Sequence, residues 1–275
     1  MLQDIEQYLA CPHCARPLVL DGRTLRCASG HGFDQAKQGY VSLLAGDAHT
    51  GTGDTAEMVA ARTAFLSAGH YRPIADALAG AAAAEGPVEG LVADLGAGTG
   101  HYLAHVLERA GGVGAALDIS KYALRRAAKA HPRIGALVCD AWRPLPLQDH
   151  SAELLLNVFA PRNGPEMRRV LRPGGRLLLV TPTSRHLREL VAALGLLSVD
   201  EEKERRTEEK LSPWFTHTDR TEVEFTLRLG RAEAEAVVAM GPNAWHTDRE
   251  KLAAALAGLP DPVEVTGSVL LTTYR

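Results

Sequence analysis

The stretch V92-A-D-L-G-A-G-T-G100 decides the fold of this chain of 275 residues. It contains most of a short apolar run, Leu91–Leu95, and leads into a segment with helical periodicity over residues 101–110. Glycine permits tight turns and the close approach of a ligand to the backbone. The free amide groups at the start of a helix can donate hydrogen bonds to that ligand. A glycine triplet alone is equally compatible with a plain strand-to-helix turn or with a dinucleotide site.

The order of residues in this stretch argues against a dinucleotide site. The dinucleotide fingerprint is G-x-G-x-x-G, whereas this chain reads D-x-G-x-G-x-G, with Asp94 ahead of the glycines. That order resembles class I S-adenosylmethionine methyltransferases, in which the turn passes the amino-acid end and the ribose of the cofactor. The resemblance implies that the cofactor is bound by Asp94, Gly96, Gly98, Thr99 and Gly100.

Apolar runs alternate with helical segments after the glycine turn. The runs are Gly114–Asp118, Gly135–Cys139, Ala152–Phe159 and Arg176–Thr181. Such alternation is typical of an α/β protein whose parallel sheet is covered on both faces. Together with the motif, it predicts a class I methyltransferase fold: a Rossmann-like, mostly parallel sheet of seven strands.

Two acidic residues follow the next strands of this predicted sheet. Asp118 ends the second run, where the resembled family has an acid that accepts the protons of both ribose hydroxyls. Asp140 and Ala141 follow the third run, where that family holds the edge of the adenine. Taken alone, either acid is about as likely to cap a helix as to bind a ligand. Their order and spacing, with the R172-P-G-G175 turn, favour the methyltransferase interpretation.

Three of the four cysteines lie close together near the N-terminus. Cys11 and Cys14 have C-x-x-C spacing, and Cys27 and His31 form a second knuckle that can complete a tetrahedral zinc site. His13 is the rival fourth ligand, but we expect it to point away from the centre. Four protein ligands close the coordination sphere, so this zinc should be structural.

The sequence predicts a zinc-binding, RNA-recognising module over residues 1–45, a linker over 46–54 and a methyltransferase domain over 55–275. The linker, GDAHTGTGD, is small, polar and rich in glycine. The module is too short to build a sufficient core alone, and a structural zinc can supply roughly 10–16 kcal/mol in such modules. Chelation is therefore expected to unfold the first 45 residues and to spare the larger domain.

Bulk composition places few limits on function. A hydrophobic content of 46% and a charged content of 23% are those of an ordinary globular protein. The formal net charge of -3 neither indicates nor excludes a nucleic-acid partner. No apolar run approaches the ~20 residues that span a bilayer, and the start MLQDIEQYLA lacks the features of a signal peptide. We therefore expect a cytoplasmic protein that does not contact membranes.

Further motifs narrow the resemblance. They are F33-D-Q-A-K-Q-G-Y-V-S-L-L44, G53-D-T-A-E-M58 and R62-x-x-F-L-x-x-G-H-Y-x-P73. With the zinc knuckles, they are similar to the bacterial 23S rRNA (guanine-N1)-methyltransferase family of the RlmA type, over essentially the whole chain. The resemblance implies a homodimer that methylates N1 of guanine 748 or guanine 745 in hairpin 35 of 23S rRNA. It further implies that the zinc modules help to hold this RNA.

The same resemblance implies additional functional details. Tyr71 and His186 are expected to contact the cofactor, together with Gly98 and Thr99. One branch of the family confers resistance to tylosin-type macrolides, and the alanine, glycine and arginine bias of this chain leans toward that branch.

The stretch N157-V-F-A-P-R-N163 is expected to line the acceptor pocket. Amino-group methyltransferases often carry an Asn/Asp-Pro-Pro-aromatic motif there, and its absence from this sequence speaks against an exocyclic amine target. Asn157 is predicted to border the cofactor as well. Asn157 and His101 are candidates for removing the guanine N1 proton, and Phe159 is a candidate for stacking on a flipped guanine.

Two groups of basic residues are candidates for phosphate contacts, which would make RNA binding sensitive to salt. The first group is Lys121, Arg125, Arg126, Lys129 and Arg133, and the second is Arg162, Arg168, Arg169, Arg172 and Arg176. Two alternative functions stay open. The first is a small-molecule methyltransferase with a structural zinc appendage. The second is a non-catalytic, zinc-dependent RNA-binding protein.

Overall fold

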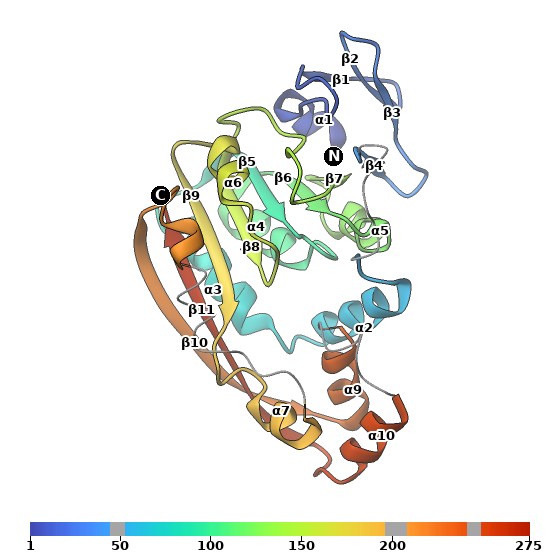
Figure 1. The fold of residues 1–275 in the computed structure, drawn as a ribbon, viewed down its shortest axis with the longest axis vertical. Coiled ribbons are helices and arrows are strands. Elements are labelled where there is room, and N and C mark those ends of the chain that lie inside the picture. The colour runs from blue at the N-terminus through green and yellow to red at the C-terminus, as the bar shows by residue number, and fades with distance from the viewer. Residues whose placement is uncertain (45–52, 196–207, 241–248) are drawn as a thin grey trace.

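An eight-stranded sheet forms the centre of the computed structural model, which describes residues 1–44, 53–195, 208–240 and 249–275 (Figure 1). Most of the predicted linker, and most of the charged stretch 200–210, lie outside the described residues. The strand order is β10-β11-β9-β8-β5-β6-β7-β4, parallel from β4 to β9 and antiparallel at β11 and β10. The strands are β4 (Tyr40–Ser42), β5 (Val88–Leu95), β6 (Gly111–Asp118), β7 (Ile134–Val138), β8 (Ala152–Val158), β9 (Leu171–Pro182), β10 (His217–Leu229) and β11 (Val263–Tyr274).

The sheet has one strand more than the seven predicted. The additional strand is β4, which pairs in parallel with β7, from Tyr40 opposite Ala136 to Ser42 opposite Val138. It comes from the segment before residue 45 and extends the edge of the sheet. A three-residue strand is too short to show an alternating pattern in the sequence.

One side of the sheet, which we call the helical face, carries Val92, Leu154 and Leu178. Successive strand residues point to opposite faces, and these side chains share one apolar core with the surrounding helices. The helices that contribute to this core are α2 (Ala56–Ser67), α3 (Arg72–Ala83), α4 (His101–Ala110), α5 (Lys121–Ala130), α7 (Arg188–Leu194), α9 (Arg231–Ala239) and α10 (Arg249–Ala257). None of the helices in the described ranges is long and apolar enough to cross a membrane.

The opposite side, which we call the N-terminal face, carries Leu91, Leu155 and Leu177. It is covered by α6 (Gly164–Val170) and by the first part of the chain (Figure 1, blue). The N-terminal elements are α1 (Leu2–Ile5), the 3-10 helix η1 (Glu6–Tyr8) and a small antiparallel sheet of β1 (Leu18–Asp21), β2 (Thr24–Cys27) and β3 (Gly32–Asp34).

The N-terminal segment packs directly on the central sheet. A Cβ atom on Gly135 of β7 would lie 2.2 Å from Ile5 Cδ1, so only glycine allows this approach of α1. The connection between β7 and β8, residues 139–151, is a loop with a single β-bridge, formed between Leu147 and Leu9. The amide of Ala10 also donates to the carbonyl of Pro146 at 3.1 Å. The N-terminal segment thus lies along the loop that joins these two strands.

This packing bears on the expected domain division. Ile5, Leu9 and Leu25 belong to the same buried cluster as Leu117 and Leu137 of the central sheet. The boundary at residue 45 stays a prediction. The expectation that chelation spares the larger domain does not fit a shared core, because unfolding the first part would expose one face of the sheet to water.

Candidate active site and metal centre

The glycine turn lies at the carboxyl end of β5, under the loop that follows β8. Gly96 has φ +78°, and a Cβ atom there would lie 2.4 Å from the Cβ atom of Ala160. The amides of Gly96 and Ala97 both donate to the carbonyl of Leu117, at 2.8 and 3.1 Å. The turn is therefore fixed between β6 on one side and the predicted acceptor loop on the other.

Asp118, the predicted ribose acid, anchors this turn. One carboxylate oxygen accepts from the amide of Gly98 at 2.8 Å, and the other accepts from the amide of Ser120 at 2.8 Å. Burial raises the pKa of Asp118, while these two amides act in the opposite direction. A carboxylate oxygen can accept a second hydrogen bond, so Asp118 retains capacity for ribose hydroxyls.

Asp94 and Asn157 place unpartnered oxygens beside the turn. Asp94 is buried, and its Oδ1 has no hydrogen-bond partner among the described residues. Burial, with the nearby Asp118 carboxylate, raises the pKa of Asp94 to about 8. Asn157 is also buried: its Nδ2 donates to the carbonyls of Leu95 at 3.2 Å and Pro161 at 2.9 Å, whereas its Oδ1 is unpaired within the described ranges. Buried polar atoms without partners are costly, so these oxygens fit a polar, cationic ligand.

Tyr71 and His186, far apart in the sequence, meet at the same end of the sheet. The Tyr71 hydroxyl lies 3.0 Å from His186 Nε2, and His186 Nδ1 accepts from the amide of Ser268 at 3.1 Å. Burial lowers the pKa of His186 to about 4, so the ring is neutral near pH 7. A neutral ring that accepts at Nδ1 carries its proton on Nε2. Nε2 therefore donates to the Tyr71 oxygen, which leaves the Tyr71 proton available to another acceptor.

Phe159 lies at the open edge of this arrangement. It is 40% exposed, and its ring centroid is 6.3 Å from that of Tyr71 and 5.9 Å from that of His186. Its φ of +54° places it in the left-handed region, which is uncommon for a bulky residue and often marks a functional constraint. An exposed ring in this position can stack on a planar ligand.

Asp140 and Ala141 connect the acceptor loop with the end of β7. Asp140 Oδ1 accepts from the amide of Trp142 at 2.9 Å, and the Ala141 carbonyl accepts from Asn163 Nδ2 at 3.0 Å. Trp142 is 63% exposed. A second exposed indole, that of Trp214 at 43%, lies against Gly164, directly after Asn163. The composition alone did not single out these two tryptophans.

His101, a candidate base, begins α4 directly after the glycine turn. Its ring packs against Tyr102 and His105, with centroids 5.2 and 4.6 Å away. Burial lowers its pKa to about 4, and in the part of the chain that the structure describes its buried Nε2 has no hydrogen-bond partner. Such a ring is a weak base near neutral pH.

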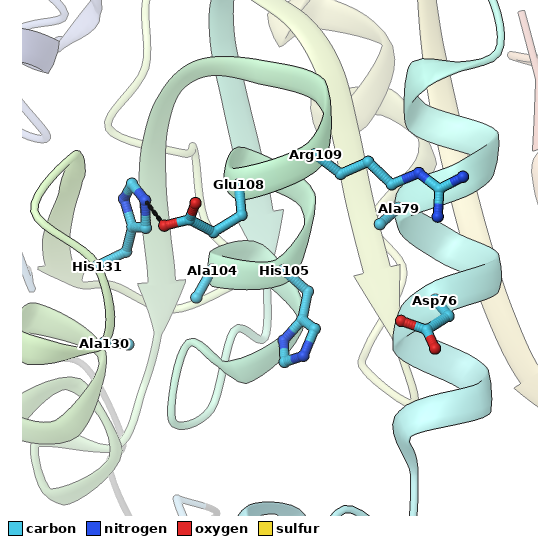
Figure 2. Close-up of a pocket in the computed structure, with 8 residues that line it drawn as sticks. All are labelled: Asp76, Ala79, Ala104, His105, Glu108, Arg109, Ala130 and His131. Carbon is cyan, nitrogen blue, oxygen red and sulfur yellow. Dashed lines mark hydrogen bonds and ion pairs between the residues drawn. The ribbon is translucent and has the colours of Figure 1, made fainter.

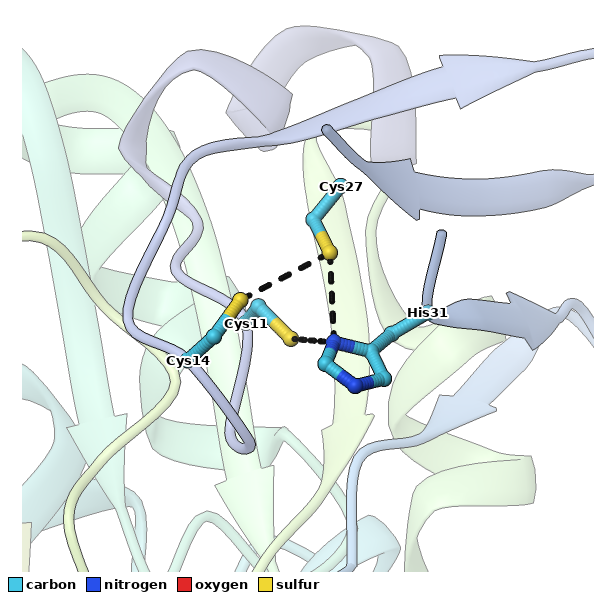
Figure 3. Close-up of side chains that lie close together, drawn as sticks. All are labelled: Cys11, Cys14, Cys27 and His31. Atoms are coloured by element: carbon cyan, nitrogen blue, oxygen red, sulfur yellow. Dashed lines mark hydrogen bonds between the residues drawn. The ribbon is translucent and has the colours of Figure 1, made fainter. Parts of the chain in front are cut away.

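The predicted metal ligands converge on one point (Figure 3). His31 Nδ1 lies 3.5 Å from Cys11 Sγ and 3.3 Å from Cys27 Sγ, and Cys14 Sγ lies 3.7 Å from Cys27 Sγ. Tetrahedral zinc with these ligands requires edges of about 3.8 Å between sulfurs and about 3.6 Å between sulfur and nitrogen. The four side chains therefore fit a zinc ion. His13 is not in this group; its ring packs against His31 and Phe33.

A separate cavity of about 320 Å³ lies among α3, α4 and the end of α5 (Figure 2). His131 and Glu108, which meet there at 2.9 Å, form an ion pair only when the histidine is protonated. The other lining residues are Asp76, Ala79, Ala104, His105, Arg109 and Ala130. The lining includes none of the predicted cofactor or metal residues.

Several arginines that the sequence offered as phosphate ligands serve the fold instead. The guanidinium of Arg176 is largely buried and donates to the carbonyls of Ala81 and Ala82 at the end of α3. Arg133 donates to the carbonyl of Gly112, and Arg169 pairs with Glu166. Cys139, outside the metal group, is buried beside the sheet as expected.

Comparison with known proteins agrees with this arrangement. Residues 9–48 match the RlmA N-terminal zinc ribbon, and residues 92–175 match a methyltransferase domain. The chain is 52% identical to the 23S rRNA (guanine(748)-N(1))-methyltransferase of Streptomyces fradiae, covering 100% of this chain and 99% of that protein. It is 51% identical to a protein of Micromonospora griseorubida whose name provisionally assigns it the guanine-N(1) activity, covering 100% and 99%.

Solved structures support the fold alone. One match is to a chain from a complex between the Haloferax volcanii Trm112 methyltransferase activator and a provisionally assigned methyltransferase. The TM-score is 0.50 at 18% identity, covering 81% of this chain and 97% of that chain.

Proposed function

This chain belongs to the 23S rRNA (guanine-N1)-methyltransferase family, and from that membership we propose that it methylates N1 of a guanine in hairpin 35 of 23S rRNA. The target is the guanine at position 748, which the name of the Streptomyces fradiae relative specifies. One structural observation carries the proposal: two buried oxygens, of Asp94 and Asn157, have no hydrogen-bond partner among the described residues and border a glycine turn, against which the loop with the exposed ring of Phe159 packs.

S-adenosylmethionine supplies a methyl group on a positively charged sulfur when it is bound. Asp94 and the turn from Gly96 to Gly100 would border its amino-acid end, Asp118 would hold its ribose, and Asp140 with Ala141 would border its adenine. Tyr71 and His186, which meet at the same end of the sheet, would also contact it. Alignment of donor and acceptor can contribute roughly 7–11 kcal/mol to lowering the barrier.

The acceptor guanine stacks on Phe159, above the loop that Asn157 holds. Guanine N1 carries a proton at neutral pH, and transfer requires that this proton leave. The pKa values of His101 and His186 are both about 4, so neither ring is matched to this task. The proton therefore passes to water at the open edge beside Phe159, while the Tyr71 proton, free to donate, stabilises negative charge developing on the base.

The assembled enzyme is a cytoplasmic homodimer in which the zinc modules help to hold the RNA, as the family resemblance implies. Methylation of hairpin 35 then protects the ribosome against tylosin-type macrolides. Light scattering tests the dimer. Expression in a sensitive host tests the resistance, with Asp94→Ala as the inactive control.

The decisive experiment incubates the protein with tritiated cofactor and unmodified 23S rRNA and maps the label by nuclease digestion and mass spectrometry. A hairpin already carrying N1-methylguanine at the target position serves as the blocked control. We expect label on N1 of the hairpin guanine and none on the blocked hairpin. Transfer to a metabolite pool instead of RNA would establish the small-molecule alternative, and RNA binding without transfer would establish the non-catalytic one.

A further inference from the structure

Arg62 and Asp54 form an ion pair at the mouth of the glycine turn, and the mechanism above does not use it. Arg62 projects from α2, and its Nη1 pairs with the Asp54 carboxylate. The two side chains are 27% and 19% exposed, so the pair is partly shielded from water but accessible.

Two hydrogen bonds fix the position of this pair. Arg62 Nη2 donates to the carbonyl of Met240 at 2.7 Å, at the end of α9. The Ser120 hydroxyl donates to the Asp54 carbonyl at 2.7 Å, which ties Asp54 to the residues after β6. The pair is therefore held against the cofactor turn by elements from three parts of the chain.

The guanidinium lies directly over the turn. A Cβ atom on Gly98 would lie 3.4 Å from Arg62 Nη1 and 3.8 Å from Arg62 Cδ. Both Asp54 and Arg62 are close enough to influence the pKa of Asp118, in opposite directions. Any group that passes along the turn beside Gly98 therefore meets a fixed positive and a fixed negative charge.

From this geometry we propose that Arg62 and Asp54 form the binding site for the zwitterionic amino-acid end of the cofactor. The proposal rests on the proposed function above. The α-carboxylate pairs with the Arg62 guanidinium and takes the place of Asp54. The released Asp54 carboxylate then pairs with the α-ammonium group. The single Arg62–Asp54 ion pair of the free protein is thereby replaced by two ion pairs with the ligand.

The alternative is a purely structural role, in which Arg62 links α2 to α9 through the Met240 carbonyl. The two roles differ in which part of a ligand depends on Arg62. A structural residue supports the whole site, whereas the proposed pair recognises only the amino-acid end. S-adenosylhomocysteine carries that end, and 5′-methylthioadenosine carries the same nucleoside without it.

The test is titration calorimetry of the full-length, zinc-loaded protein with these two ligands. In Arg62→Ala we expect S-adenosylhomocysteine to bind roughly 10- to 100-fold more weakly, because a charge-assisted hydrogen bond is lost. The affinity for 5′-methylthioadenosine should stay within about twofold of wild type. Arg72→Ala is the matched control, because it removes the exposed Arg72–Asp76 pair on the neighbouring α3. It should change neither affinity.

Asp54 is tested with a third ligand, an S-adenosylhomocysteine analogue that lacks the amino group. Asp54→Asn should weaken S-adenosylhomocysteine but bind the analogue as tightly as wild type or more tightly, because the competitor for Arg62 is gone. If Arg62→Ala lowers the melting temperature of the free protein, Arg62→Lys replaces it and should give a smaller, still selective loss.

Equal losses for S-adenosylhomocysteine and 5′-methylthioadenosine, or no loss for either, would overturn the pair as a recognition site and leave the proposed function standing. If the wild-type protein bound neither ligand, both proposals would fall together.

Discussion

The two faces of the central sheet are covered in different ways. The helical face is covered by long helices, with side chains such as Leu78 and Leu103 fully buried against the strands. The N-terminal face is covered mainly by a four-residue helix, short strands and a loop, around Ile5, Leu9 and Leu25. Elements this short cannot hold their own shape, so the Cys3His cluster has to fix them. On the N-terminal face, the metal centre therefore stabilises the covering layer, as helix packing does on the helical face.

The largest expected effect comes from removing one metal ligand. Cys27→Ala should lower the free energy of unfolding by more than about 5 kcal/mol, because the closed zinc site contributes most of the stability of the N-terminal face. Thermal unfolding measures the loss of stability, and elemental analysis measures the zinc content of the variant. Cys139→Ala is the matched control, since Cys139 is equally buried on this face but outside the cluster; it should cost about 1–2 kcal/mol and retain zinc. Similar losses for both variants would contradict the comparison.

A second prediction compares one buried side chain on each face. Ile5→Ala and Leu78→Ala should each cost roughly 2–5 kcal/mol, since both side chains are fully buried against the same sheet. Urea unfolding followed through one probe on each side should give a single transition in both variants. If Ile5→Ala produced an early transition limited to the first 44 residues, the N-terminal segment would be an independent appendage.

A third prediction asks which face meets RNA. Trp142 and Trp214 border the acceptor loop, whereas Tyr122, 37% exposed, projects from α5 on the helical side. Stacking of an unpaired base on an aromatic side chain contributes roughly 1–3 kcal/mol. Trp142→Ala should therefore weaken binding of the hairpin about 5- to 100-fold in a fluorescence anisotropy titration. Tyr122→Ala should leave it unchanged; the reverse order would place the RNA along the basic helix α5.

The smallest expected effect concerns Asp94, at the end of β5 between the two faces. Its pKa of about 8 in the free protein means that the carboxyl is largely protonated at pH 6. A bound cationic group favours the carboxylate and lowers this pKa, so binding releases a proton. The affinity for S-adenosylmethionine, whose sulfonium is cationic, should therefore rise with pH between 6 and 8, by about tenfold or 1.4 kcal/mol for each unit by which binding lowers the pKa. It should level off above pH 8, and the slope should vanish in Asp94→Asn.

The sequence predicted the features that local spacing encodes. The knuckles with Cys14 and Cys27 identified the metal group, and the apolar runs before Asp118 and Asp140 identified two neighbouring strands that end beside these acids. Contacts between distant residues were beyond its reach. Gly135 gave no sign that Ile5 packs on it, because 130 positions of sequence separate the two.

Charge alone was a poor guide to individual arginines. Arg176 belonged to a basic cluster in the sequence, but its guanidinium satisfies the last carbonyls of α3. Arg62 lay in a family motif without an assigned role, and only the folded chain places it above Gly98. A guanidinium can donate to phosphate, carboxylate or backbone with equal ease, and only the geometry decides which.

Hydrogen exchange of the zinc-stripped protein, read by mass spectrometry, tests most directly whether the metal-bound segment is a structural layer of the methyltransferase. The shared core predicts that amides of β7 and of the loop 139–151 lose protection together with residues 9–44, while α3 and α4 keep more of theirs. Loss confined to residues before 45, with β7 and the loop as protected as in the zinc-loaded protein, would contradict it.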